Sequence, residues 1–150
     1  MEFEQKILEN IGKILWSIFP EDAVQINFIF QLFKQHRGDM VSLKLKDGSE
    51  GYLDELPPYE AVNEIFELII ELQNSPLFQK EKFTHGTISI TDTKKIFTKF
   101  AYVAEEDNWP YLFMRGVSEL SKDEINKYYI PEKTWNERVA KRPKKKSFDL

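Results

Sequence analysis

Residues 23–46 read AVQINFIFQLFKQHRGDMVSLKLK and alternate apolar with polar side chains through most of their length. The alternation covers residues 23–35 and 40–46, and a period of two is typical of a strand with one face buried. Between the two runs, His36-Arg37-Gly38-Asp39 has the composition of a turn, because Gly38 is free to adopt a positive φ. The stretch therefore predicts a β-hairpin.

The segments on either side of this hairpin complete a mixed fold. Apolar residues at helical spacing predict amphipathic helices over residues 2–18 and 58–74. Gly51-Tyr52-Leu53 predicts a short strand, and a second alternating pair of runs flanks the polar turn Thr91-Asp92-Thr93-Lys94. We expect an α+β fold: an antiparallel sheet built from two hairpins and packed with an N-terminal helix and a central helix.

The C-terminal third predicts short helices and a basic end. Ser121-Lys122-Asp123-Glu124 has the spacing of a capping box, which predicts a short helix from about residue 122 to Tyr129. Pro131 favours the start of another helix that runs through Val139. We expect one domain over residues 1–140, followed by a basic flexible tail over residues 141–150, where like charges disfavour a helix.

Composition excludes several classes of protein and favours basic partners. The chain has 150 residues, 41% of them hydrophobic, and no cysteine, which excludes disulfides, thiolate metal sites and cysteine nucleophiles. Residues 131–150 carry seven Lys/Arg against three Asp/Glu, whereas residues 1–130 carry 14 against 22. An acidic body argues against a nucleic-acid-binding surface and favours a basic partner.

The N-terminus has no secretory character. Glu2, Glu4 and Glu9 stand where a signal peptide would be basic, and no apolar run approaches the length of a membrane span. We therefore expect a cytoplasmic protein that makes no membrane contact.

Catalytic and metal-binding motifs are not evident in the sequence. It has no phosphate-binding loop, dinucleotide fingerprint, HExxH or GxSxG motif. His36 and His85 leave open a small metal-free hydrolase, with one histidine acting beside an acidic cluster. The acidic clusters lack the ligand spacing and glycine of a calcium loop. We expect a protein that is not an enzyme and holds no metal or cofactor.

Two loops combine carboxylates with aromatic residues, as protein-recognition surfaces do. Acidic side chains give charge complementarity, and Trp and Tyr give anchors that bury large areas at an interface. The candidate binding residues are Asp54, Glu55, Glu60, Glu105, Glu106, Asp107, Trp109 and Tyr111.

The basic C-terminal run leaves a second interpretation open. Lys141 to Lys146 contains five Lys/Arg, and such a run can dock on nucleic acid or on a larger assembly. Under this hypothesis the protein is an adaptor or structural subunit.

The order of elements resembles that of the YezG-like immunity proteins, which are small bacterial antitoxins. The shared features are an N-terminal helix ending in Ile18-Phe19-Pro20-Glu21-Asp22, a long strand with Phe28 and Phe30, and Gly51-Tyr52-Leu53-Asp54-Glu55-Leu56-Pro57 leading into a helix. The Phe83–Phe100 hairpin, an acidic loop and a segment containing Trp109 follow.

The resemblance implies a cytoplasmic protein without enzymatic activity. It would bind the C-terminal toxin domain of a contact-dependent growth inhibition system or related polymorphic toxin, and such toxins are often nucleases. A nuclease carries basic surface to hold phosphate, so an acidic inhibitor would associate with it quickly and specifically.

Overall fold

The computed structural model describes residues 2–53, 59–142 and 145–148, the last range by its main chain. The chain divides into two compact units. We call the first the helix unit, which comprises the described residues of Met1–Ile29, Met40–Lys82 and Thr87–Thr98. The second is the loop unit, which comprises those of Phe30–Asp39, Phe83–Gly86 and Lys99–Leu150.

The sheet has the strand order β3-β2-β1-β4-β5-β6. The hydrogen bonds Leu32 N–H to Thr84 O and Asp92 N–H to Val24 O join opposite ends of β1 and β4, as antiparallel neighbours require. β2 pairs with β3, and β5 with β6, both antiparallel. The strands are β1 (Ala23–Leu32), β2 (Arg37–Leu45), β3 (Glu50–Tyr52), β4 (His85–Thr91), β5 (Ile96–Val103) and β6 (Lys145–Phe148). The α+β class and both hairpins predicted from the sequence are confirmed.

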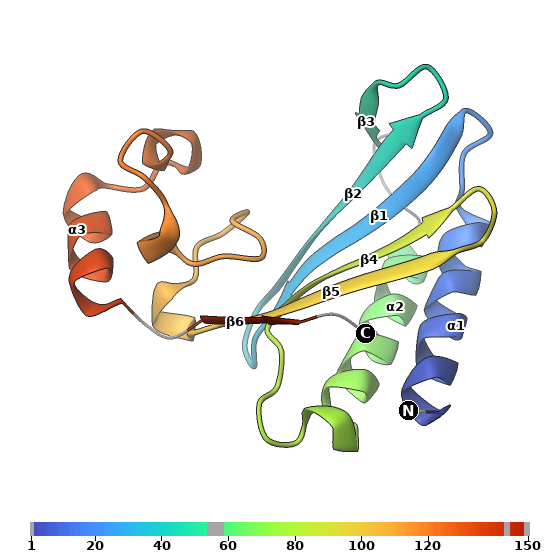
Figure 1. The fold of residues 1–150 in the computed structure, drawn as a ribbon, viewed down its shortest axis with the longest axis horizontal. Coiled ribbons are helices and arrows are strands. Elements are labelled where there is room, and N and C mark those ends of the chain that lie inside the picture. Colours follow the sequence, from blue (N-terminus) through green and yellow to red (C-terminus); the bar gives the residue numbers. More distant parts are fainter. Residues whose placement is uncertain (1, 54–58, 143–144, 149–150) are drawn as a thin grey trace. The chain divides into compact units, whose positions relative to one another are not determined.

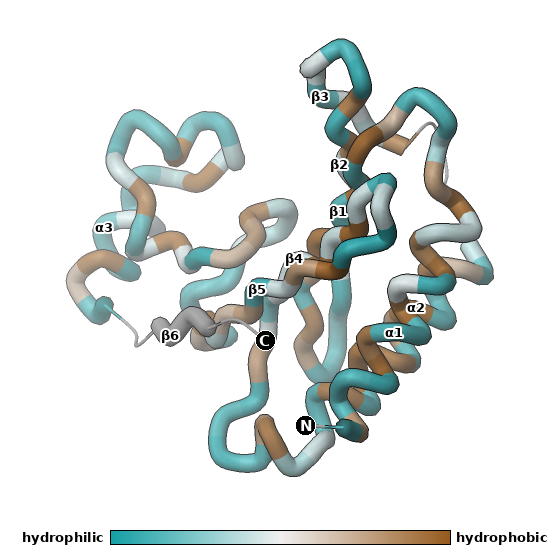
Figure 2. The backbone as a smooth tube through the Cα atoms, turned by 45° about the vertical axis from the view of Figure 1, so that its right-hand side comes forward, coloured by the Kyte–Doolittle hydropathy of each residue, from teal (hydrophilic) through white to brown (hydrophobic). Residues whose placement is uncertain are grey.

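In the helix unit, α1 (Glu2–Ser17) and α2 (Tyr59–Gln73) lie side by side against one face of the strands (Figure 1). Phe66 of α2 meets Phe28 of β1 edge to face, with 5.5 Å between ring centroids. Gly12 lets α1 approach β5 closely, because a Cβ at this position would lie 2.8 Å from the Ile96 side chain. The apolar stripes of both helices follow the predicted spacing (Figure 2).

The loop unit has its own small core beneath irregular segments. Leu112, Val117, Leu120, Ile125 and Ile130 are buried together, and three aromatic side chains pack against them: Trp109, Tyr128 and Trp135. The segments around this core are the 3₁₀ turns η2 (Glu105–Asp107), η3 (Val117–Glu119) and η4 (Ile125–Tyr128) and the helix α3 (Glu132–Lys141). The core therefore holds together a part of the chain that has little regular hydrogen bonding of its own.

The first hairpin turns earlier than the composition indicates. Phe33 N–H donates to His36 O at 2.9 Å, which closes the turn before Arg37 begins β2. Gly38 therefore lies in a strand, and the described glycine with a positive φ is Gly48, at 87°. The turn was misplaced because a tight turn needs no glycine when its main chain stays in allowed regions.

The C-terminal segments also differ in detail from the expectation. The short helix before Tyr129 is the 3₁₀ turn η4, and Tyr129 ends it with a φ of 59°. Residues 145–148, which we expected in the flexible tail, form β6. Main-chain pairing with β5 gives this lysine-rich stretch hydrogen bonds that a like-charge argument does not consider. Among the described residues, no helix has both the length and the apolarity of a membrane span.

Candidate functional site

The acidic turn η2 is held from inside by one of its own carboxylates. Asp107 is 3% exposed. Its carboxylate accepts hydrogen bonds from the Ser118 amide at 3.0 Å and from the Ser118 hydroxyl at 2.6 Å. Gly116 stands beside it, where any Cβ would collide with the same carboxylate. Asp107 therefore joins η2 to η3 and faces away from solvent, whereas Glu105 and Glu106 are exposed.

The segment that follows η2 is fixed by two polar anchors. The buried Gln31 amide donates to Trp109 O at 3.4 Å and to Leu112 O at 3.2 Å. The Trp109 indole N–H donates to Tyr128 O at 2.8 Å. Trp109 therefore carries a structural role, and the main chain on both sides of Tyr111 is held in place.

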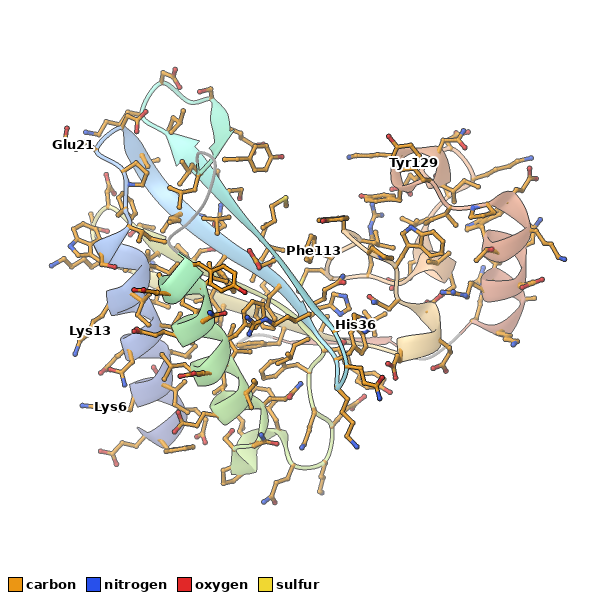
Figure 3. The ribbon with its side chains drawn as sticks, turned by 180° about the vertical axis from the view of Figure 1, so that it is seen from behind. Lys6, Lys13, Glu21, His36, Phe113 and Tyr129 are labelled. Atoms are coloured by element: carbon orange, nitrogen blue, oxygen red, sulfur yellow. The ribbon has the colours of Figure 1, made fainter. Side chains whose placement is uncertain are left out.

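Tyr111 is displayed by a left-handed backbone. Its φ is 64° and its side chain is 76% exposed, and Met114 nearby has a φ of 70°. Such conformations cost free energy in residues other than glycine, and besides turns and helix ends they cluster at binding and catalytic sites. Tyr129, with a φ of 59°, is presented in the same way and is 89% exposed (Figure 3). Both tyrosines offer aromatic surface on short, constrained segments.

A hollow of about 740 Å³ lies beside Tyr111 within the loop unit. One side comes from the β1–β2 hairpin, whose His36 is labelled in Figure 3 with Phe113 of the facing segment. The hollow combines aromatic rings with charged groups of both signs. Its lining consists of Gln31, His36, Arg37, Gly38, Asp39, Glu105, Asn108, Trp109, Pro110, Tyr111, Phe113 and Arg138.

The charged side chains of the hollow differ in the hydrogen bonds and ionic interactions that they already make. Arg138 donates from Nη1 to Asn108 O at 3.3 Å. Burial raises the pKa of the Asp39 carboxyl, and the positive charge of Arg37 offsets this only in part. The charged form of Asp39 is therefore destabilised by burial more than it is stabilised by Arg37.

The two histidines do not form a shared reactive centre. His85 is fully buried, with its Nδ1 2.9 Å from the Thr84 hydroxyl. His36 is exposed, and its Nε2 lies 3.2 Å from the Asn108 amide nitrogen. The Phe33 ring stacks on His36 and meets His85 edge to face. One histidine can therefore meet a ligand at the surface, while the other is enclosed.

The structure brings three of the eight candidate residues together. Glu105, Trp109 and Tyr111 line the hollow. Glu106 is exposed on the same turn without lining it, and Asp107 is buried. Glu60 lies exposed in the first turn of α2, in the helix unit. Asp54 and Glu55 fall outside the described residues.

Sequence reasoning did not select several of the residues that line the hollow: Gln31, Arg37, Asp39, Phe113 and Arg138. Gln31 carried a weak signal, because it is a polar residue in an otherwise apolar end of a strand. Asp39 was assigned to a turn, and Arg138 lies on a helix without a fully buried residue. Nothing in their spacing shows that these residues meet.

Among the described residues, no three His, Asp or Glu side chains are grouped so that they could hold a metal ion. No protein-family model matches the chain, and no curated protein matches its sequence.

Proposed function

We propose that this protein is an immunity protein that binds and neutralises a basic toxin domain. The observation that carries the proposal is the segment 105–111, which presents Glu105, Glu106 and Tyr111 beside a hollow on a constrained main chain. Carboxylates and exposed aromatic rings on one short segment suit the recognition of a basic protein surface.

Pre-organisation of this segment supports tight binding. Asp107 and Gln31 fix the segment from inside the loop unit. Tyr111 is already held in a costly backbone conformation before any partner arrives. A surface that is ordered in advance loses less conformational entropy when it binds. The exposed groups can then contribute to affinity without first ordering a loop.

Charge on the helix unit supports fast association with a basic partner. The sequence of this unit has 15 Asp/Glu against eight Lys/Arg. Four exposed carboxylates follow one face of α2, which contains no Lys or Arg: Glu60, Glu64, Glu67 and Glu71. Such a field raises the encounter rate with a positively charged protein and weakens as salt is added.

The two alternatives find less support among the described residues. A small hydrolase that uses one histidine beside an acidic cluster could not use His85, because this side chain is fully buried. Its remaining candidate is His36, which is exposed and lines the hollow with Glu105. A docking arm would need a free tail, and the main chain of residues 145–148 is paired with β5. Binding through segment 105–111 requires neither exposure of His85 nor release of residues 145–148 from β5.

The proposal is tested with the C-terminal domain encoded by the open reading frame immediately upstream. That domain, taken as about 100–250 residues, is purified in a catalytically inactive form and mixed with this protein. We expect a stable complex on a sizing column. Calorimetry should show that Glu105→Lys with Glu106→Lys weakens binding by at least about tenfold, the equivalent of 1.4 kcal/mol.

A matched double reversal controls for net charge. Asp123→Lys with Glu137→Lys changes the charge equally, at exposed positions of the loop unit that do not line the hollow. This variant should bind more tightly than the segment variant. Absence of a complex, or equal losses in the two variants, would remove the support for this function and this surface.

A further inference from the structure

We propose that the hollow in the loop unit receives the guanidinium group of an arginine side chain. The inference deepens the proposed function and rests on it for the partner, which would present that arginine from its basic surface. The combination that carries it is three aromatic residues, Trp109, Tyr111 and Phe113, and two carboxylates, Asp39 and Glu105, around one hollow.

The aromatic lining favours guanidinium over other charged groups. Arginine stacks its planar group on aromatic rings and is less strongly hydrated than an ammonium or a carboxylate. Trp109 is fixed by its hydrogen bond to Tyr128 O, and Tyr111 by its constrained main chain. The Trp109 ring and the main chain that carries Tyr111 are therefore in place before a ligand enters.

Among the charged residues of the lining, Asp39 and Glu105 would attract a cation, whereas Arg37 and Arg138 would oppose it. Selection of a guanidinium therefore relies on stacking on the aromatic rings together with pairing to these carboxylates. An incoming guanidinium would provide Asp39 with a second cation beside Arg37, whose charge offsets the burial of this carboxyl only in part. Ion pairs formed with planar, forked donors are also the best oriented.

The two arginines that line the hollow affect how an incoming charged ligand can bind there. Arg138 is engaged with Asn108 O and forms part of the wall. Arg37 lowers the pKa of Asp39, so it already interacts with the carboxylate that a ligand would use. If a guanidinium binds here, Arg37 competes with it. If a carboxylate binds here, Arg37 assists it instead. Replacing Arg37 therefore separates the two ligand chemistries by the sign of the effect.

The experiment is a titration of the full chain with blocked amino acids, followed by two-dimensional amide NMR. The probes are Nα-acetylarginine methylamide, the corresponding citrulline derivative as a neutral isostere, and the corresponding glutamate derivative as an anion. We expect the arginine probe to shift the Trp109 indole and Gln31 side-chain signals saturably. The other two probes should not. Saturable shifts with the glutamate probe, equal shifts with the citrulline probe, or no shifts would each overturn the proposal.

Four variants test the assignment of the binding groups. Asp39→Asn and Glu105→Gln should each weaken arginine binding by about two- to fivefold, the range of a partly exposed ion pair. Tyr111→Leu, which keeps an apolar side chain without a ring, should weaken it by a similar factor. Arg37→Ala should strengthen it. Weakening by Arg37→Ala would overturn the assignment.

Asp123→Asn is the matched control, because Asp123 is an exposed carboxylate of the loop unit that does not line the hollow. It should leave the arginine titration unchanged. The titration contains no toxin, so its failure is distinguishable from failure of the proposed function. A toxin complex that forms while the probe does not bind would refute the hollow alone.

Discussion

Asp107 and Glu106 are neighbours with opposite environments. Asp107 is enclosed and accepts two hydrogen bonds from Ser118, whereas Glu106 faces solvent. In the sequence both belong to one acidic cluster. The direction of each side chain decides its role: Asp107 points inward and supports the loop, whereas Glu106 points outward, where a partner can bind it. A substitution of Asp107 should therefore affect stability, and a substitution of Glu106 should affect binding.

We predict that Asp107→Asn lowers the free energy of unfolding by about 1–3 kcal/mol, because the amide keeps only one of the two buried oxygens that accept hydrogen bonds from Ser118. The control Glu106→Gln should change it by less than about 0.5 kcal/mol, as exposed substitutions do. Urea denaturation of the purified variants measures both. Equal stabilities would contradict the role given to Asp107.

Two aspartates should give pH effects of opposite sign. Burial raises the pKa of Asp39, so in the window between its unfolded and folded pKa values the folded state holds a proton that the unfolded state has released. Its contribution to stability therefore falls as pH rises. Hydrogen bonds from Ser49 lower the pKa of Asp47, so its contribution is present above the unfolded pKa and is lost as pH falls through the folded one.

We therefore predict that Asp39→Asn raises the melting temperature at neutral pH, whereas Asp47→Asn lowers it. In acid, below both folded pKa values, each variant should approach the wild-type melting temperature. Circular dichroism melting curves at pH 7 and over a series of decreasing pH values measure the differences. A shift of the same sign for both variants at pH 7 would contradict the two assignments.

At the scale of elements, β6 matters because it covers the outer edge of β5. Its main chain pairs over Phe100–Val103 of β5. An uncovered edge offers free main-chain groups to another molecule. The edge is therefore protected by the segment that the sequence indicated would be a free tail.

We predict that a chain ending at Arg142 self-associates at high concentration, because the β5 edge is then open. The control replaces Lys144, Lys145 and Lys146 with Gln, which removes the charge and keeps the main chain of β6. This control should remain monomeric if the strand rather than its charge protects the edge. Light scattering of sizing-column peaks measures the mass. A monomeric truncated chain would contradict this role for β6.

The acidic face of α2 gives a kinetic prediction. Reversal of Glu64, Glu67 and Glu71 to Lys should slow association with the basic toxin domain by at least about tenfold at low salt, with little change in dissociation. Lys6→Glu with Lys13→Glu, on exposed positions of α1 (Figure 3), should accelerate association. Stopped-flow fluorescence over a salt series measures both rates. Association rates that stay the same in both charge variants would exclude electrostatic steering by the helix unit.

At the scale of the whole molecule, periodicity predicted the elements that have regular side-chain patterns. The helices over residues 2–18 and 58–74 and both hairpins were found this way, since burial of one face imposes a period of 3.6 or two. The turn at Phe33–His36 was misplaced because its hydrogen bond requires no characteristic residue. The strand β6 was missed because edge pairing depends on a partner distant in sequence.

The hollow was predictable only in part. Glu105, Trp109 and Tyr111 were selected by their chemistry within one segment. Gln31, Asp39 and Arg138 come from two other parts of the chain, and the 3₁₀ turns that help to bring them together have no periodic signal. Burial of Asp107 was equally hidden, because its partner Ser118 lies on another turn.

The most direct test of the central claim is growth of cells that express the active upstream-encoded toxin domain together with this protein. We predict that the wild-type chain restores growth. The Glu105→Lys, Glu106→Lys variant should fail to restore it at equal expression, while the Asp123→Lys, Glu137→Lys control succeeds. A toxic domain that the wild-type chain does not neutralise would contradict the proposal that this protein confers immunity.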